Sequence, residues 1–151
     1  MTLHLRYELT GTGWADCTFE LDGQRVHTTA SYLSDALDDL CRATLEVLRG
    51  ESHAEAVFEE EPGEYRWLLD RSEDQRVRIR IVDGVTTREN PIDAVVVDGV
   101  CTARELGQAV LSELQRLIEL HGEEGYHKEC VRFPFPRSRL EDLRAVLVAN
   151  A

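Results

Sequence analysis

The first third of the chain alternates apolar and polar residues. In residues 3–10 and 15–21 every second side chain is apolar, which is the period of a half-buried β-strand. The turn residues Gly11-Thr12-Gly13 and Asp22-Gly23 separate these segments and introduce a third strand. Short turns bring the apolar positions together on one face, pairing Leu9 with Ala15, Tyr7 with Cys17, Leu5 with Phe19, and Phe19 with Val26. The pattern therefore predicts a three-stranded antiparallel meander.

A helical pattern replaces the alternation after residue 33. Ser34 is a suitable N-cap, and three aspartates follow it near the positive end of the predicted helix. Gly50 is placed to end the helix as a C-terminal glycine. Residues spaced three and four apart make up its expected buried stripe: Leu37, Leu40, Cys41, Thr44, Val47 and Leu48.

A second alternating region follows that helix. Strands are predicted at residues 54–60, 65–70 and 76–82. The turn at Glu61-Pro62-Gly63-Glu64 is expected to set Phe58 opposite Trp67 and Glu59 opposite Arg66. Residues 85–91 are predicted to form a loop or a frayed edge, and the apolar, β-branched stretch 94–97 a short further strand.

Two helices end the chain. Thr102-Ala103-Arg104-Glu105 is a capping box, and the helix that it opens is expected to end at Gly122. The last helix is predicted over roughly residues 137–148, after Pro134 and Pro136. The order βββ-α-βββ(β)-α-α indicates one α+β domain over residues 1–151. We expect a single antiparallel sheet of about six to seven strands with two to three helices packed on one face.

The net charge of the chain narrows the classes of molecule that it is expected to bind. The sequence has 29 acidic and 17 basic side chains, a formal net charge of −12. No basic patch is visible, which argues against nucleic-acid binding, whereas an acidic surface favours a basic protein partner. No stretch approaches the ~20 apolar residues of a membrane helix, and the N-terminus does not have the pattern of a signal peptide. The four cysteines, at positions 17, 41, 101 and 130, lack paired spacing. We therefore expect a soluble, cytoplasmic protein with reduced thiols.

The densest negative segment is the turn of the second meander. Four glutamates lie there, Glu59, Glu60, Glu61 and Glu64, and would attract a basic partner. Three arginines share the polar side of the neighbouring strands and would complete a partner-binding surface: Arg66, Arg78 and Arg80. The alternative interpretation is a solvated hairpin in which Glu59 pairs with Arg66, and Asp70 and Glu55 help neutralise the arginines.

Residues 121–130 contain the side chains with the most reactive chemistry. His121, His127 and Cys130 are of the types that bind zinc or transfer protons. Structural zinc sites usually show two close ligand pairs, and only one group is present, so a structural role is favoured over a metal site. Cys101, directly before the capping box, is a second candidate nucleophile. The chain has no glycine-rich phosphate loop and no nucleophile elbow, and no cofactor is predicted.

Three segments together carry a resemblance: residues 31–40, 61–67 and 121–136. In this combination the chain resembles small acidic α+β proteins of unassigned function from high-GC, actinobacterial-type bacteria. In size, charge and class it is also similar to the immunity proteins that neutralise bacterial toxins. The resemblance implies no catalytic residue. We expect a non-catalytic interaction module of the immunity or inhibitor type. The alternatives are a small-ligand or metal-dependent enzyme that uses residues 121–130, and a structural domain that forms a homodimer through its sheet.

Overall fold

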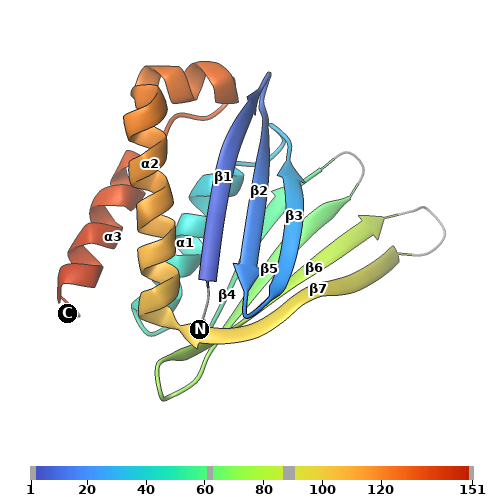
Figure 1. The fold of residues 1–151 in the computed structure, drawn as a ribbon, viewed down its shortest axis with the longest axis vertical. Helices are drawn as coiled ribbons and strands as arrows, with labels where there is room; N and C mark the ends of the chain where they lie inside the picture. The colour runs from blue at the N-terminus through green and yellow to red at the C-terminus, as the bar shows by residue number, and fades with distance from the viewer. Residues whose placement is uncertain (1–2, 61–62, 87–90, 150–151) are drawn as a thin grey trace.

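Strands and helices follow one another in the predicted order (Figure 1). The computed structural model describes residues 3–60, 63–86 and 91–149. Its elements are β1 (Leu3–Gly11), β2 (Trp14–Leu21), β3 (Gln24–Ala30), α1 (Ala36–Leu48), β4 (His53–Glu59), β5 (Glu64–Arg71), β6 (Arg76–Thr86), β7 (Pro91–Thr102), α2 (Ala103–Cys130) and α3 (Arg137–Ala149).

The strands form two antiparallel sheets, so the expectation of a single sheet is wrong. One sheet contains β1, β2 and β3, and the other contains β4, β5, β6 and β7. Their apolar faces pack against each other, as the aromatic side chains show. The ring of Phe19 lies 4.9 Å from that of Trp67, and the ring of Tyr7 lies 6.4 Å from that of Phe58. Each of these four side chains is at most 4% exposed.

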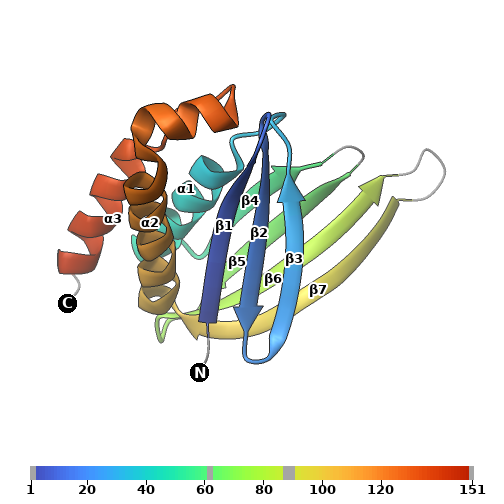
Figure 2. The same cartoon turned by 45° about the horizontal axis from the view of Figure 1, so that its top comes forward.

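A single sheet and two stacked sheets are compatible with the same hydrophobic pattern, because each meander has one apolar face in either arrangement. In the observed fold each sheet covers the other, and the helices close one side of the sandwich, with α1 beside β4 and α2 beside β1 (Figure 2). A single sheet of seven strands would be about 34 Å wide at ~4.8 Å per strand. Three helices, each roughly 10 Å across, would have had to cover that face alone.

The first meander has the predicted register. Leu5 stands opposite Phe19, Tyr7 opposite Cys17 and Leu9 opposite Ala15. On the next strand pair, Phe19 stands opposite Val26, and Glu20 opposite Arg25. The short turns fix this register, and the residues that face inward are mostly buried as expected.

The hairpin of β4 and β5 is shifted by two residues from the prediction. Phe58 stands opposite Tyr65 rather than Trp67, and Glu59 opposite Glu64 rather than Arg66. The turn closes with a hydrogen bond from the Glu60 N–H to the Gly63 carbonyl at 2.9 Å. A shift of two residues keeps every side chain on its face, so the buried set is unchanged. The rings of Phe58 and Trp67 still touch as predicted, with centroids 5.5 Å apart.

Strands β6 and β7 extend well beyond the predicted segments 76–82 and 94–97. Strand β6 ends at Thr86 and β7 begins at Pro91, so every described residue of the expected loop or frayed edge belongs to a strand, while residues 87–90 lie outside the description. A β-bulge between Ile81 and Val82 interrupts their pairing. Near the other end, a Cβ atom on Gly99 would lie 2.7 Å from Leu21 Cδ2, so glycine allows β7 to approach the three-stranded sheet closely.

The helices begin and end close to the predicted residues. The N-cap of α1 is Asp35 rather than Ser34, because the Ser34 hydroxyl accepts a hydrogen bond from the Glu59 N–H instead. Thr102 and Glu105 form the predicted capping box of α2. Gly122 interrupts α2 with φ 68° and ψ 171°, and a further helical segment continues to Cys130. No helix in the described part of the chain is both long and apolar enough to cross a membrane.

Charged side chains from α2 close the outer edge of β1. The Tyr7 N–H donates to Glu113 Oε2 at 2.8 Å, and Arg116 Nη2 donates to the Tyr7 carbonyl at 2.8 Å. Arg116 also holds both carboxylate oxygens of Glu113 at 3.0 Å. The pair therefore takes up the two backbone groups that an edge strand would otherwise expose. We call such an acid–arginine pair, spaced by three residues on a helix, an edge clamp.

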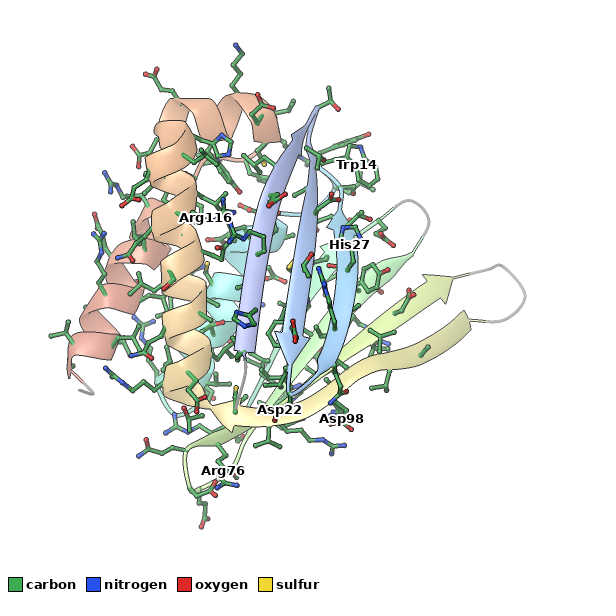
Figure 3. The ribbon with its side chains drawn as sticks, in the orientation of Figure 1. Trp14, Asp22, His27, Arg76, Asp98 and Arg116 are labelled. Carbon is green, nitrogen blue, oxygen red and sulfur yellow. The ribbon has the colours of Figure 1, made fainter. Side chains whose placement is uncertain are left out.

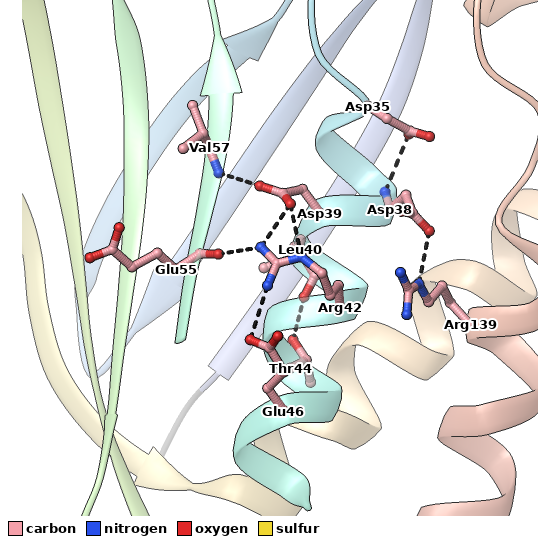
Figure 4. Close-up of polar contacts among 10 residues, drawn as sticks. All are labelled: Asp35, Asp38, Asp39, Leu40, Arg42, Thr44, Glu46, Glu55, Val57 and Arg139. Atoms are coloured by element: carbon pink, nitrogen blue, oxygen red, sulfur yellow. Dashed lines mark hydrogen bonds and ion pairs between the residues drawn. The ribbon is translucent and has the colours of Figure 1, made fainter. Parts of the chain in front are cut away.

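A second edge clamp closes β4 (Figure 4). The Val57 N–H donates to Asp39 Oδ2 at 2.7 Å, and Arg42 Nη2 donates to the Glu55 carbonyl at 2.6 Å. Arg42 is held in place by Asp39 at 2.8 Å, three residues earlier on α1. The helix that follows each meander thus closes the first strand of the other meander, which ties the two sheets together.

Candidate functional site

The turn between β4 and β5 lies against the end of β3. The Ser31 N–H donates to the Glu59 carbonyl at 2.8 Å, and the Thr29 hydroxyl donates to the Glu60 carboxylate. Glu59 stands directly opposite Glu64. We call Glu59, Glu60 and Glu64 the acidic tip; the predicted site residue Glu61 lies outside the described residues.

The acidic tip concentrates negative charge near one tyrosine. Burial raises the pKa of the Tyr65 phenol, and the carboxylates of Glu60 and Asp83 raise it further. Asp83 stands opposite Tyr65 on β6. Like charges placed opposite each other on a strand pair cost stability, as Glu59 and Glu64 do. The tip is therefore an electrostatically unfavourable arrangement that a cation from another molecule would relieve.

The predicted arginine row meets carboxylates on neighbouring strands. Arg78 holds Asp98 through two hydrogen bonds at 2.9 and 2.7 Å, and Arg80 donates to Asp70 at 2.8 Å. The expected neutralisation by Asp70 is found at Arg80, whereas Arg78 pairs with Asp98, an acid that was not expected there. Arg66 stands between Val57 and Val82 on the same outer face. Because Arg78 and Arg80 are charge-balanced, the row does not offer the excess positive charge of an anion site.

His53 joins this network beside Asp70. Its Nδ1 lies 2.7 Å from Asp70 Oδ1, and its Nε2 lies 2.9 Å from Glu55 Oε1. These hydrogen bonds, first that with Asp70, raise the pKa of His53. Imidazole can donate from both nitrogens only when protonated, so the geometry favours the charged ring. His53 was not among the expected site residues, and its position two residues before Glu55 on a strand was the available signal.

The candidate metal ligands sit on the short helical segment after Gly122. His127 is exposed, His121 is half-buried at the end of the preceding helix, and Cys130 is half-buried. Among the described residues, no three histidine, cysteine, aspartate or glutamate side chains come together in a way that could hold a metal ion. His127 instead borders a shallow hollow with Glu124, Lys128 and Val131.

Cys130 belongs to a different cluster. Its thiol hydrogen-bonds to the hydroxyl of Tyr126, a residue that is 1% exposed. Burial raises the pKa of Tyr126, and Tyr7, Cys130 and Asp35 raise it further. Burial also raises the pKa of Asp35 to about 6, with Asp38 adding to the shift. The sequence could not indicate this cluster, because its members come from β1, the N-cap of α1 and the end of α2.

Cys101 is not placed as a nucleophile. The side chain is 2% exposed, and burial raises the pKa of its thiol to about 12. The nearby carboxylates of Glu105 and Asp22 act in the same direction. Because the thiolate is the reactive form, the start of α2 does not activate this cysteine.

The outer face of the three-stranded sheet carries a shallow hollow of about 460 Å³. Its lining mixes cations and anions at every level: His4, Arg6, Glu8, Asp16, Thr18, Glu20, Arg25 and His27. His27 lies 3.6 Å from Asp16, and Arg6 reaches Glu113 at 4.0 Å. Figure 3 shows His27 on this face, with Arg116 pointing from α2 towards β1. The face is polar as predicted, but it does not select ligands of one charge.

Comparisons with family models, with curated proteins and with solved structures found no match to this chain.

Proposed function

We propose that the protein is a non-catalytic interaction module that binds a basic protein partner, in the manner of an immunity or inhibitor protein. The observation that carries the proposal is the acidic tip. Glu59 faces Glu64, and Glu60 and Asp83 both lie close to the Tyr65 hydroxyl. A basic side chain from a partner would relieve this repulsion, which the folded chain alone retains.

The chemistry of the remaining candidates supports the same conclusion. Burial raises the pKa of the Cys101 and Cys130 thiols, so neither favours the thiolate. Arg78 forms an ion pair with Asp98, and Arg80 forms one with Asp70. We assign them, with Arg66, to the rim of the partner-binding surface beside the acidic tip.

Charge reversal tests the proposal. The tip variant replaces Glu59, Glu60 and Glu64 with lysine, and the control replaces the exposed residues Glu119, Glu124 and Glu141, so both change the net charge equally. Affinity capture from the native host at low and high salt, read by mass spectrometry, should give one stoichiometric basic partner that high salt releases. We expect the tip variant to bind this partner at least tenfold more weakly, and the control to bind it nearly as wild type does.

Two outcomes would contradict the proposal. Equal losses in the two variants would mean that only net charge matters. Full binding by the tip variant would place the partner elsewhere on the molecule.

A further inference from the structure

Side chains close the exposed strand edges at three places. Two are the edge clamps on β1 and β4. The third is on β7, where the Gln24 Nε2 donates to the Asp98 carbonyl at 2.8 Å and the Asp98 N–H donates to Gln24 Oε1 at 2.9 Å. The Gln24 side-chain amide thus hydrogen-bonds to both backbone groups of Asp98, as a residue of a neighbouring strand would. Closed edges of this kind prevent unwanted strand pairing.

The stretch Ala94–Val97 of β7 is different, because only the β-bulge at its extra residue Val96 disturbs the edge there. Within the described part of the chain, no side chain hydrogen-bonds to its backbone, although it continues the edge that Gln24 closes at Asp98. In Figures 1 and 2 this part of β7 extends past β3, away from the helices. Three of its side chains are exposed: Ala94, Val95 by 57% and Val96 by 37%. We call Ala94–Val97 the free edge.

Val95 lies on the outer face of the four-stranded sheet beside one other valine. It stands opposite Val82, and one strand further Val82 stands opposite Arg66, which is itself opposite Val57. A strand added beside β7 would place its own apolar side chain next to Val95 and extend the apolar pair of Val95 and Val82. An added strand would therefore remove apolar surface of the exposed valines from water.

The free edge is also flanked by negative charge. Asp83 stands opposite Ala94, and Glu64 stands opposite Gly84 on the next strand pair. A strand with alternating apolar and basic residues complements this surface. A second copy of the chain does not, because each copy carries a net charge of −12. The remaining edge strand, β3, presents the exposed polar residues Arg25 and His27, of which the charged Arg25 disfavours strand addition.

We infer that the free edge receives an extended, basic segment of the partner protein, which joins the four-stranded sheet as an additional strand beside β7. Backbone hydrogen bonds would supply the register, and Val95 and Asp83 would select apolar and basic side chains. This inference rests on the proposed function and specifies how the partner binds.

The probe is an acetylated octapeptide of alternating lysine and valine. Its control has proline in place of the two central valines, which removes ladder donors. Binding to the full-length protein is followed by amide chemical shifts and by hydrogen exchange. We expect the amides of Ala94–Val97 to gain at least tenfold protection with the lysine–valine peptide and none with the proline peptide.

A matched pair of variants separates strand addition from simple charge attraction. The β7 variant carries Val95→Glu and Val96→Glu. The control carries Leu120→Glu and Val148→Glu, at sites that are 65% and 76% exposed. Both variants are more acidic than wild type by the same two charges. Charge attraction alone predicts equal or tighter peptide binding by both. Strand addition predicts at least tenfold weaker binding by the β7 variant only.

Absence of protection in Ala94–Val97 at millimolar peptide would overturn the inference, as would self-association that the β7 variant abolishes. Failure of the proposed function would give a different pattern of results. In that case the peptide still protects the free edge, but reversal of the acidic tip leaves capture of the native partner unchanged. If only the inference fails, the tip variant loses the native partner and the β7 variant retains it.

Discussion

The fold opposes the negative charge of Asp35. Its carboxyl group caps α1 through the Asp38 N–H at 3.4 Å, and burial together with Asp38 raises its pKa from 3.8 to about 6. The folded state therefore binds a proton more tightly than the unfolded chain does. Between about pH 4 and pH 6 the stability of the fold should fall as the pH rises, because the unfolded state then loses the proton more readily.

Replacing Asp35 with asparagine should remove this penalty. Asparagine caps a helix as well as aspartate does and has no charge to bury. We expect Asp35→Asn to increase the free energy of unfolding by about 1–2 kcal/mol at pH 7.5, a value reduced for the partial exposure of the carboxyl group, and by little at pH 4. Urea unfolding at both pH values measures the difference. Glu141→Gln, an exposed position, is the control, and an equal gain in both variants would contradict the assignment.

At the scale of elements, two helices use the same chemistry to close two strand edges. Glu113 on α2 is 6% exposed and hydrogen-bonds to both Arg116 and the backbone of β1. On α1, Asp39 and Arg42 hydrogen-bond to each other and to the backbone of β4. An acid and an arginine three residues apart are visible in the sequence, but their usual interpretation is a surface ion pair. The strand residue that Glu113 contacts lies 106 positions away, so the sequence gives no sign of the contact.

Loss of an edge clamp should be costly. Glu113→Ala leaves the Tyr7 N–H and the Arg116 guanidinium without their carboxylate, and we expect the free energy of unfolding to drop by about 2–4 kcal/mol. Glu119→Ala, on the exposed side of the same helix, should change it by less than about 0.5 kcal/mol. Urea unfolding measures both. Hydrogen exchange should also show faster exchange at Tyr7 in the first variant, and similar effects of the two substitutions would count against the clamp.

Turn length decided which registers could be predicted. The Asp22-Gly23 turn contains two residues, which leaves one register for β2 and β3. Between β1 and β2 the register shifts after the pair Gly11 and Trp14, and the apolar alternation identifies the pairing of Leu9 with Ala15. The β4–β5 turn admits more than one length, and the bonded pair is Glu59 with Glu64. The apolar pattern cannot detect this shift of two residues, because it leaves both faces intact. The sequence therefore identified the buried residues of β4 and β5 but paired the charges of the acidic tip wrongly.

For the whole molecule, the decisive fact is that the two meanders stack. Strand number, order and apolar faces could be predicted, since local periodicity determines them. Whether two meanders continue side by side or face each other depends on contacts such as Phe19 with Trp67, which lie far apart in the sequence. The one local sign was Gly99, a glycine inside a strand, which often marks a close backbone approach.

The stacking predicts coupling between Gly99 and Leu21. A valine at position 99 would collide with the fully buried Leu21 side chain, and we expect Gly99→Val to cost about 1–3 kcal/mol. Leu21→Ala alone should cost about 2–5 kcal/mol. In the double variant the added volume partly fills the space that Leu21 leaves, so the combined loss should be at least about 0.5 kcal/mol smaller than the sum. Additive losses in a double-mutant cycle, measured by urea unfolding, would show that the two residues do not touch.

The long separation between β1 and its edge clamp has a consequence during protein synthesis. Tyr7 is made 106 residues before Glu113, and ribosomes add about 5–20 residues per second, so the edge of β1 waits roughly 5–20 s for the side chains that close it. During this interval the nascent meander carries an unprotected edge in a crowded cell. The most hazardous moment for this molecule is thus on the ribosome, before α2 has emerged, and slower translation of α2 should increase the fraction that aggregates.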